Sequence, residues 1–298
     1  MNLDTLRIFC SVVTQKSFSR GAAANKISQS AATQAVRRLE RELGVELIDR
    51  TRRPFLLTPA GEMCYEAFRE LLEIYDSVTA RLQSMRAEVA GTVRVGAIYS
   101  VGLHDMSECM RQFLRRYPQA QVRLEFLHPS RIYEAVLAGE LDMGVISYPQ
   151  SSPEIDVIPL REERMVLVCS PEHRFADREE VEVKELAGEA FVAFDRALAI
   201  RRHVDRYLRE RNVNVQIVMA FDNIETIKQA VEVGVGISIL PEPTVRREAA
   251  TGSLKVITLK PDELYRPVGI IHHHRKVFTP AMAKFIELLK ELSAPPMA

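Results

Sequence analysis

Residues 28–44 read SQSAATQAVRRLERELG, and this stretch decides how the amino-terminal part of the chain folds. Ser28 is a good N-cap, because its hydroxyl can accept from the free backbone N–H groups of the first helical turn. Gly44 suits the left-handed position that follows a helix end. Helical spacing puts the apolar side chains on one inner side and leaves a polar outer face. The predicted inner side consists of Ala31, Ala32, Ala35, Val36, Leu39 and Leu43.

A second helical segment, residues 18–27, runs directly into this helix. Two helices joined by a tight turn predict a DNA-binding unit whose second helix enters the major groove, although an ordinary helical hairpin with a solvated charged face is the alternative. Gln suits adenine and Arg suits guanine at base edges, whereas phosphate contacts fix the register. The candidate phosphate contacts are Ser17, Ser19, Arg20 and Lys26, and the candidates on the second helix are Ser28, Gln29, Ser30, Thr33, Gln34, Arg37 and Arg38.

Residues 45–61, VELIDRTRRPFLLTPAG, contain two short apolar runs on either side of a basic turn. They predict a two-stranded wing in which Arg50, Arg52 and Arg53 follow a DNA backbone or enter a minor groove. Residues 1–60 hold ten Lys or Arg against five Asp or Glu, whereas the whole chain has 40 of each. A basic end on a neutral protein is typical of DNA binding.

A long helix is predicted from Thr58 as cap and Pro59 as first helical residue, with Gly91 at its end. Apolar residues within it alternate at spacings of four and three, which is a heptad pattern. This regularity favours pairing with a second helix over packing on its own domain. A dimer would read an inverted repeat in double-stranded DNA. The candidate dimerisation residues are Phe68, Leu71, Tyr75, Val78, Leu82 and Met85.

From residue 91 onward, short apolar strands alternate with helices. This alternation is typical of an α/β fold with a parallel-type sheet and helices on both faces. Two such units fit, one over 91–161 with 268–298 and the other over 162–267. Ligands in such folds bind beyond the carboxyl ends of the strands.

The loops at those strand ends offer hydroxyl groups, amides and free N–H groups that suit a small anion. Arg131 or Arg196 can add positive charge. For each serine taken alone, a plain helix cap is the simpler interpretation, and Asp222 with Glu225 has the pattern of a capping box. The residues considered at this site are Ser100, Val101, Ser130, Arg131, Ser147, Phe194, Asp195 and Asn223.

The first 61 residues resemble the winged helix-turn-helix of LysR-type transcriptional regulators. The matching pieces are LDTLRIFCSVVTQKSFSRGAA, the 28–44 helix and ELIDRTRRPFLLTPAG, and the length and two-part layout extend the resemblance to nearly the whole chain. Ser30 departs from the family's usual proline, Ala32 from a larger aliphatic residue and Ile48 from a frequent phenylalanine.

The resemblance implies three domains: a winged helix-turn-helix at 1–58, a linker and dimerisation helix at 59–90, and a two-lobed effector-binding domain, similar to periplasmic binding proteins, at 91–298. It implies a sequence-specific transcriptional regulator controlled by a small, anionic effector. It carries the effector role most directly onto Ser100, Ser130, Ser147 and Phe194. The partners implied are promoter DNA, a second copy, a homotetramer, and RNA polymerase if the protein is an activator.

Other classes of protein are less favoured by the sequence. The four cysteines are scattered, which suggests buried thiols in a reducing compartment. An export leader and a long apolar run are both missing, so we expect a soluble, cytoplasmic protein without a membrane partner. A transport-type binding protein would need the leader, and an enzyme with a DNA-binding appendage would need a catalytic constellation that we do not find.

Two further motifs have the residue types of a metal or cofactor site but not the required arrangement. Residues 272–274 are three histidines, but neighbouring strand residues point to opposite faces and do not converge on one ion. Gly234 and Gly236 lack the third glycine of a dinucleotide loop and follow a helix rather than a strand. We therefore expect no catalytic residues, no metal and no cofactor.

Overall fold

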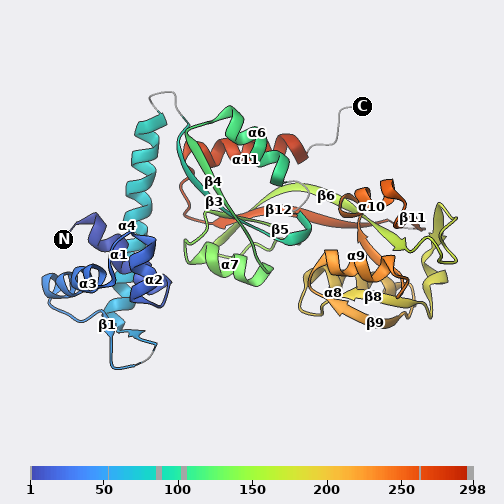
Figure 1. The fold of residues 1–298 in the computed structure, drawn as a ribbon, viewed down its shortest axis with the longest axis horizontal. Helices are drawn as coiled ribbons and strands as arrows, with labels where there is room; N and C mark the ends of the chain where they lie inside the picture. The colour runs from blue at the N-terminus through green and yellow to red at the C-terminus, as the bar shows by residue number, and fades with distance from the viewer. Residues whose placement is uncertain (1, 53, 85–88, 102–105, 262, 294–298) are drawn as a thin grey trace. The chain divides into compact units, whose positions relative to one another are not determined.

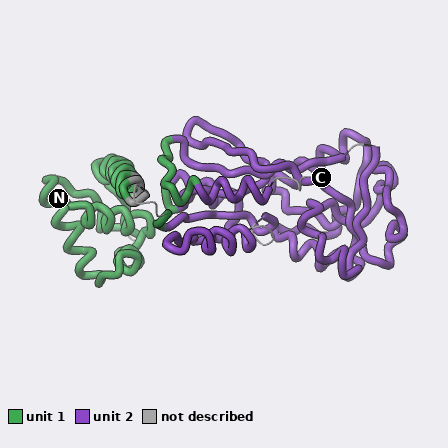
Figure 2. The backbone as a smooth tube through the Cα atoms, turned by 90° about the horizontal axis from the view of Figure 1, so that it is seen from above, with its two compact units in different colours: residues 1–91, 138–140, 275–283 green, residues 92–137, 141–274, 284–298 purple. Residues whose placement is uncertain are grey.

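The computed structural model describes residues 2–52, 54–84, 89–101, 106–261 and 263–293. The chain divides into two compact units, shown in different colours in Figure 2. Among the described helices, none combines the length and the apolar character that a membrane span requires. Unit one holds residues 1–91, 138–140 and 275–283, and unit two holds 92–137, 141–274 and 284–298.

Unit one begins with three capped helices, α1 (Leu3–Thr14), α2 (Phe18–Ala24) and α3 (Gln29–Leu43). The side chains of Asn2, Ser17 and Ser28 each accept a hydrogen bond from a backbone N–H of the first turn. Gly44 ends α3 with a left-handed φ of 72°. The predicted cap and stop of this helix are therefore confirmed.

A wing follows α3, formed by β1 (Ile48–Asp49) and β2 (Leu56–Leu57) in antiparallel pairing. The core of this region consists of buried apolar residues from the three helices and the wing. The predicted inner side of α3 was partly wrong, since Leu43 is 37% exposed and Ala31 is exposed as well. Glu40 is buried instead, because the wing covers that side of the helix end.

Helix α4 spans Pro59–Ser84 and begins beside this core (Figure 1). Phe68 is 8% exposed and packs edge-on against Phe9, with ring centroids 6.0 Å apart. This residue of the predicted dimerisation set therefore belongs to the core of unit one. Met85 lies outside the described residues. Further along, one face of α4 keeps five exposed apolar side chains, Leu71, Ile74, Tyr75, Val78 and Leu82.

Unit two contains a mixed sheet in the order β4-β3-β5-β12-β6-β11-β7, with β10 also paired to β6. The predicted parallel pairing holds for β3 with β5 and for β7 with β11. It fails for β12, which is antiparallel to both β5 and β6. The strands are β3 (Gly91–Ala97), β4 (Ala120–Phe126), β5 (Met143–Ser147), β6 (Ile155–Cys169), β7 (Glu180–Glu182), β10 (Ser238–Pro241), β11 (Lys255–Lys260) and β12 (Leu264–His273).

The two long strands β6 and β12 explain this mixed pairing. They run side by side as an antiparallel ribbon through the centre of unit two (Figure 1). Residues 155–165 of β6 pair with β12, whereas the end of β6 pairs with β10 and β11. The ribbon thus joins the sheet regions on either side of it.

Helices cover the β3–β5 region on both faces. α6 (Ser107–Arg116) and α11 (Pro280–Ser293) lie together on one side, where Phe113 meets Phe285 edge-on at 5.1 Å. α7 (Pro129–Leu137) lies on the other side (Figure 1), and the short α5 (Tyr99–Val101) follows β3.

A separate parallel pair, β8 (Ala190–Phe194) and β9 (Gln216–Phe221), forms the far part of unit two with α8 (Ala199–Glu210) and α9 (Ile224–Glu232). The turns η2 (Val183–Leu186) and η3 (Glu242–Val245) and the helix α10 (Arg246–Thr251) complete it. Each of α8 and α9 begins just after the carboxyl end of its strand. The loops predicted to bind ligand therefore gather where strands end and helices begin.

Candidate nucleic-acid interface and ligand cavity

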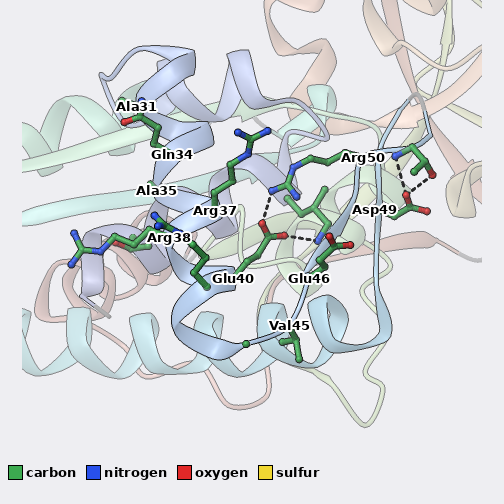
Figure 3. Close-up of a pocket in the computed structure, with 15 residues that line it drawn as sticks. Ala31, Gln34, Ala35, Arg37, Arg38, Glu40, Val45, Glu46, Asp49 and Arg50 are labelled. Atoms are coloured by element: carbon green, nitrogen blue, oxygen red, sulfur yellow. Dashed lines mark hydrogen bonds and ion pairs between the residues drawn. The ribbon is translucent and has the colours of Figure 1, made fainter.

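A groove of about 1260 Å³ lies between the outer face of α3 and the wing (Figure 3). From α3 it is lined by Gln34 and by Arg37, Arg38 and Arg41, and from the wing by Arg50. The carboxylates of Glu40, Glu46 and Asp49 line the groove as well, so the four arginines leave it with a net formal charge of +1. An excess of positive charge on this face is what an interface with a polyanion requires.

The polar side chains at the middle of α3 are free to meet a partner. Gln34 and Arg37 are exposed, and neither makes a hydrogen bond or an ion pair with any residue the structure describes. Arg38 donates to Glu42 one turn further on, at 2.9 Å. Because that pair is exposed, it is weak and can be exchanged for another anion.

The other residues predicted on α3 are tied to one another. The Ser19 hydroxyl donates to Gln29 Oε1 at 2.9 Å, which links α2 to the start of α3. The hydroxyls of Ser28 and Ser30 lie 2.9 Å apart, and Thr33 donates to the carbonyl of Gln29 at 2.9 Å. The first turn of α3 is thereby held in one arrangement.

The side chains of Ser17 and Arg20, at the start of α2, are also held by hydrogen bonds. Ser17 caps α2 by accepting from the backbone N–H of Arg20 at 3.3 Å. The guanidinium of Arg20 donates to the carbonyl of Gln15 at 2.7 Å.

Glu40 holds the wing against α3. Its Oε1 accepts from the backbone N–H groups of Leu47 at 3.0 Å and Ile48 at 3.2 Å, and its Oε2 accepts from Arg50 at 2.6 Å. Arg50 therefore neutralises a buried carboxylate as well as facing the groove. A charged residue in the last turn of an amphipathic helix looks like surface in the sequence, so pattern reasoning missed this anchor.

The tip of the wing is more open. Arg52 is 69% exposed and lies 3.9 Å from Asp49, so its charge is available to a partner. Arg53 lies outside the described residues. Asp49 accepts from the backbone N–H of Thr51 at 2.9 Å, which shapes the turn. A hydrogen bond from the Thr51 hydroxyl, together with this backbone bond and the nearby Arg52, lowers the pKa of Asp49.

A second cavity, of about 470 Å³, lies within unit two. Four of the predicted effector residues line it, namely Ser100, Ser130, Ser147 and Phe194. Ser100 lies in α5 after β3, Ser147 and Phe194 end β5 and β8, and Ser130 lies at the start of α7, so segments distant in sequence converge here. Apolar walls surround them, contributed by Ile98, Leu127, Leu137, Ile155, Leu198, Ile200 and Ile224.

The other four predicted residues do not line this cavity. Val101 is 1% exposed in the core, and Arg131 lies 3.5 Å from Glu134 on its own helix. Asp195 Oδ1 accepts from the N–H of Ala197 at 2.8 Å, in a tight turn before α8.

The cap of α9 also differs from the sequence interpretation. Asn223, rather than Asp222, is the N-cap, and its Oδ1 accepts from the N–H of Glu225 at 2.9 Å. Asp222 lies one residue earlier and lines the cavity. The carboxylate thereby takes no part in capping.

A buried ion pair between Arg266 and Glu163 contacts Ser100. Arg266 on β12 and Glu163 on β6 are each 1% exposed, and Arg266 Nε donates to Glu163 Oε2 at 2.9 Å. Arg266 Nη1 donates to the Ser100 hydroxyl oxygen at 2.8 Å. A guanidinium can only donate, so the hydroxyl hydrogen of Ser100 is left to point elsewhere. Ser100 is thereby prepared to donate to an acceptor in the cavity, which Arg266 also lines.

The sequence carried only a faint signal for this pair. Arg266 interrupts the apolar strand LYRPVGII, and Glu163 lies 103 residues earlier in a strand rich in charge. Arg161 also donates to Glu163, at 2.6 Å from Nη2. The three charges sum to +1, which favours an anion near the back of the cavity.

Further polar groups surround the cavity. The Ser130 hydroxyl lies 2.9 Å from His128 Nδ1, and Tyr133 Oη accepts from the N–H of Gln150 at 2.8 Å. The start of α8 lines the cavity as well, and the side chain of its N-cap residue, Leu198, provides no hydrogen bond. Its first N–H groups thus add positive potential.

Beside the cavity, the ring of Tyr148 stacks on His203 of α8, with centroids 4.0 Å apart. Burial raises the pKa of Tyr148 to about 12, and its hydroxyl finds no partner among the described residues. Burial, with Arg206 and Arg202 nearby, lowers the pKa of His203. The stack connects the segment after β5 to α8.

Among the described residues, no group of three His, Cys, Asp or Glu side chains is arranged to hold a metal ion. His274, of the histidine triplet, has its Nδ1 3.0 Å from Asp156 Oδ2, so the structure gives this ring a carboxylate partner.

Comparison with known proteins finds matches along nearly the whole chain. The family model "Bacterial regulatory helix-turn-helix protein, lysR family" matches residues 3–62, and the model "LysR substrate binding domain" matches residues 86–294. The HTH-type transcriptional regulator CysL of Bacillus subtilis is 23% identical over 290 residues, which are 97% of each chain.

Solved structures show the same fold. A full-length OxyR variant from Pseudomonas aeruginosa superposes with a TM-score of 0.75 at 22% identity, over 98% of this chain and 94% of that one. The CcmR regulatory domain of Synechocystis, in complex with 2-PG, gives a TM-score of 0.63 at 21% identity, over 70% of this chain and 100% of that one.

Proposed function

The chain belongs to the LysR family of DNA-binding transcriptional regulators, and we propose that Gln34 and Arg37 of α3 read the bases of its promoter site. The observation that carries this proposal is that both side chains are exposed and unpaired among the described residues, on the face of α3 that borders the wing. Arg suits guanine and Gln suits adenine in the major groove. Gln29, Ser30 and Thr33 lie about one helical turn earlier on α3, and we assign them to the same DNA-binding surface.

Phosphate contacts come from the edges of that face. Arg52 at the wing tip and Arg38 on α3 are 69% and 68% exposed, so their charges are accessible to a DNA backbone. Ser17, Ser19 and Arg20 near α2 complete the set, with Arg50 and Arg53 in the wing. These contacts fix the register on the duplex, and base contacts supply the specificity.

Regulators of this family act as oligomers, and we propose that α4 pairs two copies. Its five exposed apolar side chains, Leu71, Ile74, Tyr75, Val78 and Leu82, form one continuous face that a second helix would bury. Two heads related by a two-fold axis read an inverted repeat. A homotetramer built from two such dimers, and contact with RNA polymerase when the protein activates, complete this proposal.

The family's substrate-binding domain takes a small-molecule effector, and we propose that the 470 Å³ cavity is its site. Pockets of this size, mostly apolar with a few directed polar groups, are typical small-molecule sites. Ser100 donates to the effector because Arg266 occupies its oxygen. An anionic effector satisfies that donor, with Ser130 and Ser147 nearby.

The effector changes regulation by shifting an equilibrium between arrangements of the domain. It can do so only through a difference in affinity between them. A tenfold difference corresponds to about 1.4 kcal/mol, which suffices to change the occupancy of a promoter half-site. We place the head at 1–58, the linker helix at 59–90 and the effector domain at 91–298, and we assign no enzymatic activity. We place the protein in the cytoplasm, because a bacterial regulator meets its promoter DNA in that compartment.

Titration of a labelled promoter duplex with the full-length protein tests the DNA-binding role. The triple variant Gln29→Ala, Gln34→Ala, Arg37→Ala should lose its preference for the promoter over random duplex, because side chains that meet base edges are removed. Circular dichroism and thermal melting confirm that the variant is folded.

Lys284→Met provides the matched control, because it removes one exposed positive charge far along the sequence from α3. Its promoter affinity should equal that of the unmodified protein. Unchanged promoter preference in the folded triple variant would reject the assignment of α3 as the reading helix.

A further inference from the structure

The carboxylate of Asp222 lines the effector cavity and has no structural role that the described contacts show. It makes no hydrogen bond or ion pair with any described residue, and Asn223 rather than Asp222 caps α9. Of the described residues that line the cavity, it is the one that carries a carboxylate. An uncompensated negative charge at a site for an anion lowers affinity unless the ligand also brings a positive charge.

The buried positive group of the cavity, Arg266, lies on the main sheet of unit two. Arg266 on β12 donates a hydrogen bond to Ser100, which follows β3. Ser147, at the end of β5, lies beside this pair in the sheet, since β5 is paired with β12. Asp222 follows β9, a strand of the separate β8–β9 pair. The Arg266–Ser100 pair and the carboxylate of Asp222 are therefore presented by different sheets, whereas Arg202 and the start of α8 lie on the same side as Asp222.

Arg202 is the other charged residue that the structure places on the cavity wall beside Asp222 and Arg266. Its Nη1 donates to the carbonyl of Ala197 at 3.0 Å, which holds the guanidinium at the start of α8. Asp222 is not paired with it in the structure. The carboxylate is therefore available to a cation from the solvent side of the cavity.

We infer that the effector is a zwitterion, with an anionic group on Ser100 and an ammonium group on Asp222. The apolar walls formed by Leu127, Ile155 and Phe194 would contact a hydrocarbon body between the two charges. Amino acids with apolar side chains, or ω-amino acids, have this chemistry. This inference rests on the proposed effector site and adds the cationic end of the ligand.

A zwitterionic ligand also explains how effector binding can change the arrangement of the effector domain. Because its two charges are held by different sheets, its binding depends on how closely those sheets approach. A ligand that contacts both sides binds one arrangement better than the other, and only such a difference can shift the equilibrium.

Thermal shift and calorimetric titration of the full-length protein with matched probes test the inference. Each set shares one carbon skeleton: phenylalanine, 3-phenylpropanoate and phenethylamine; leucine, 4-methylpentanoate and isoamylamine; 6-aminohexanoate, hexanoate and hexylamine. In at least one set the amino acid should bind about fivefold more tightly than its carboxylate, as expected for a partly exposed ion pair of about 1 kcal/mol.

Two variants separate the two ends of the ligand. Asp222→Asn should remove the preference for the amino acid and leave the carboxylate's affinity unchanged or higher. Ser100→Ala should weaken both compounds by similar factors. Glu210→Gln, an exposed carboxylate at the end of α8, is the control and should change neither.

The outcomes distinguish this inference from the proposed function. If the carboxylates bind as tightly as the amino acids, and Ser100→Ala weakens them, the effector site stands and the zwitterion is overturned. Amines that bind as well as the amino acids would overturn the anionic site itself. If no probe binds, the inference of a zwitterion of these classes is rejected, while promoter binding is judged by the separate duplex titration.

Discussion

Arg266 Nε donates to Glu163 Oε2 at 2.9 Å, across two antiparallel strands whose contacting residues are 103 positions apart in sequence. Both side chains are 1% exposed. A buried ion pair adds little net stability compared with well-packed apolar residues, because two charges must be removed from water. In the structure it fixes the hydroxyl of Ser100 at the cavity wall, which is the role that the proposed effector site gives it.

Replacing Arg266 tests that pair. Arg266→Met should reduce the free energy of unfolding by about 3–5 kcal/mol, because the buried carboxylate of Glu163 loses its main partner. Urea unfolding followed by circular dichroism measures the change. Ser100→Ala, which leaves the ion pair intact, should cost about 1 kcal/mol or less. Equal losses in the two variants would contradict this account of the pair.

The wing anchor gives a second prediction. Glu40→Ala should destabilise unit one by about 2–3 kcal/mol, because the buried N–H groups of Leu47 and Ile48 lose their acceptor. DNA affinity should fall as well, since Arg50 and the wing lose their fixed position. Glu42→Ala is the control, because its pair with Arg38 is exposed to solvent and contributes little to stability. A control that is as damaging as Glu40→Ala would show that the wing does not depend on the anchor.

Two arginines of the interface should behave differently in duplex titrations. Arg37→Ala should cost about 1–3 kcal/mol on the promoter site and relax its sequence preference, because a base contact is lost. Arg52→Ala should weaken binding to all duplexes alike and reduce the salt dependence by about one unit of slope, because a phosphate contact is lost. Titrations at several salt concentrations, on promoter and random duplexes, check both. The same profile for the two variants would contradict the assignment of roles.

The exposed face of α4 predicts the oligomeric state. Val78→Glu together with Leu82→Glu should halve the mass seen by sedimentation, because two charges per helix would be buried against a second copy. Glu66→Lys, at an exposed residue of α4 on the side opposite the five-residue face, should leave the mass unchanged. If the double variant keeps its mass, α4 does not pair the subunits.

The Tyr148–His203 stack predicts a pH dependence of stability. Burial and the neighbouring Arg206 and Arg202 lower the pKa of His203 below its unfolded value of about 6.5. The unfolded chain therefore binds a proton first as the pH falls. The contribution of His203 is fully present above pH 6.5 and is lost as the pH falls toward its folded pKa.

Thermal melting between pH 8 and pH 5 measures this dependence. His203→Phe keeps an aromatic ring against Tyr148 but cannot be protonated, so its melting temperature should fall less over this range than that of the unmodified protein. Equal falls for both proteins would contradict the role of His203.

Much of unit one could be predicted from the sequence. The cap at Ser28, the left-handed Gly44 and the apolar spacing of α3 act within one or two helical turns, so local sequence determines them. The same holds for the convergence of Ser100, Ser130 and Ser147, because parallel strands followed by helices bring their carboxyl ends to one edge.

What the sequence left undecided depends on long-range contacts. An apolar repeat on α4 does not tell whether a side chain meets its own domain or a second copy, and the structure assigns Phe68 to the first. The antiparallel ribbon of β6 and β12 and the buried Glu40 follow from the path of the chain. Local propensity acts over a few residues, whereas burial and hydrogen-bond partners are set by segments that meet only after folding. The sequence by itself thus determined the capped helix α3 and the family of the protein, and the tertiary structure decided that Arg266 binds Ser100 and that Asp222 lines the cavity.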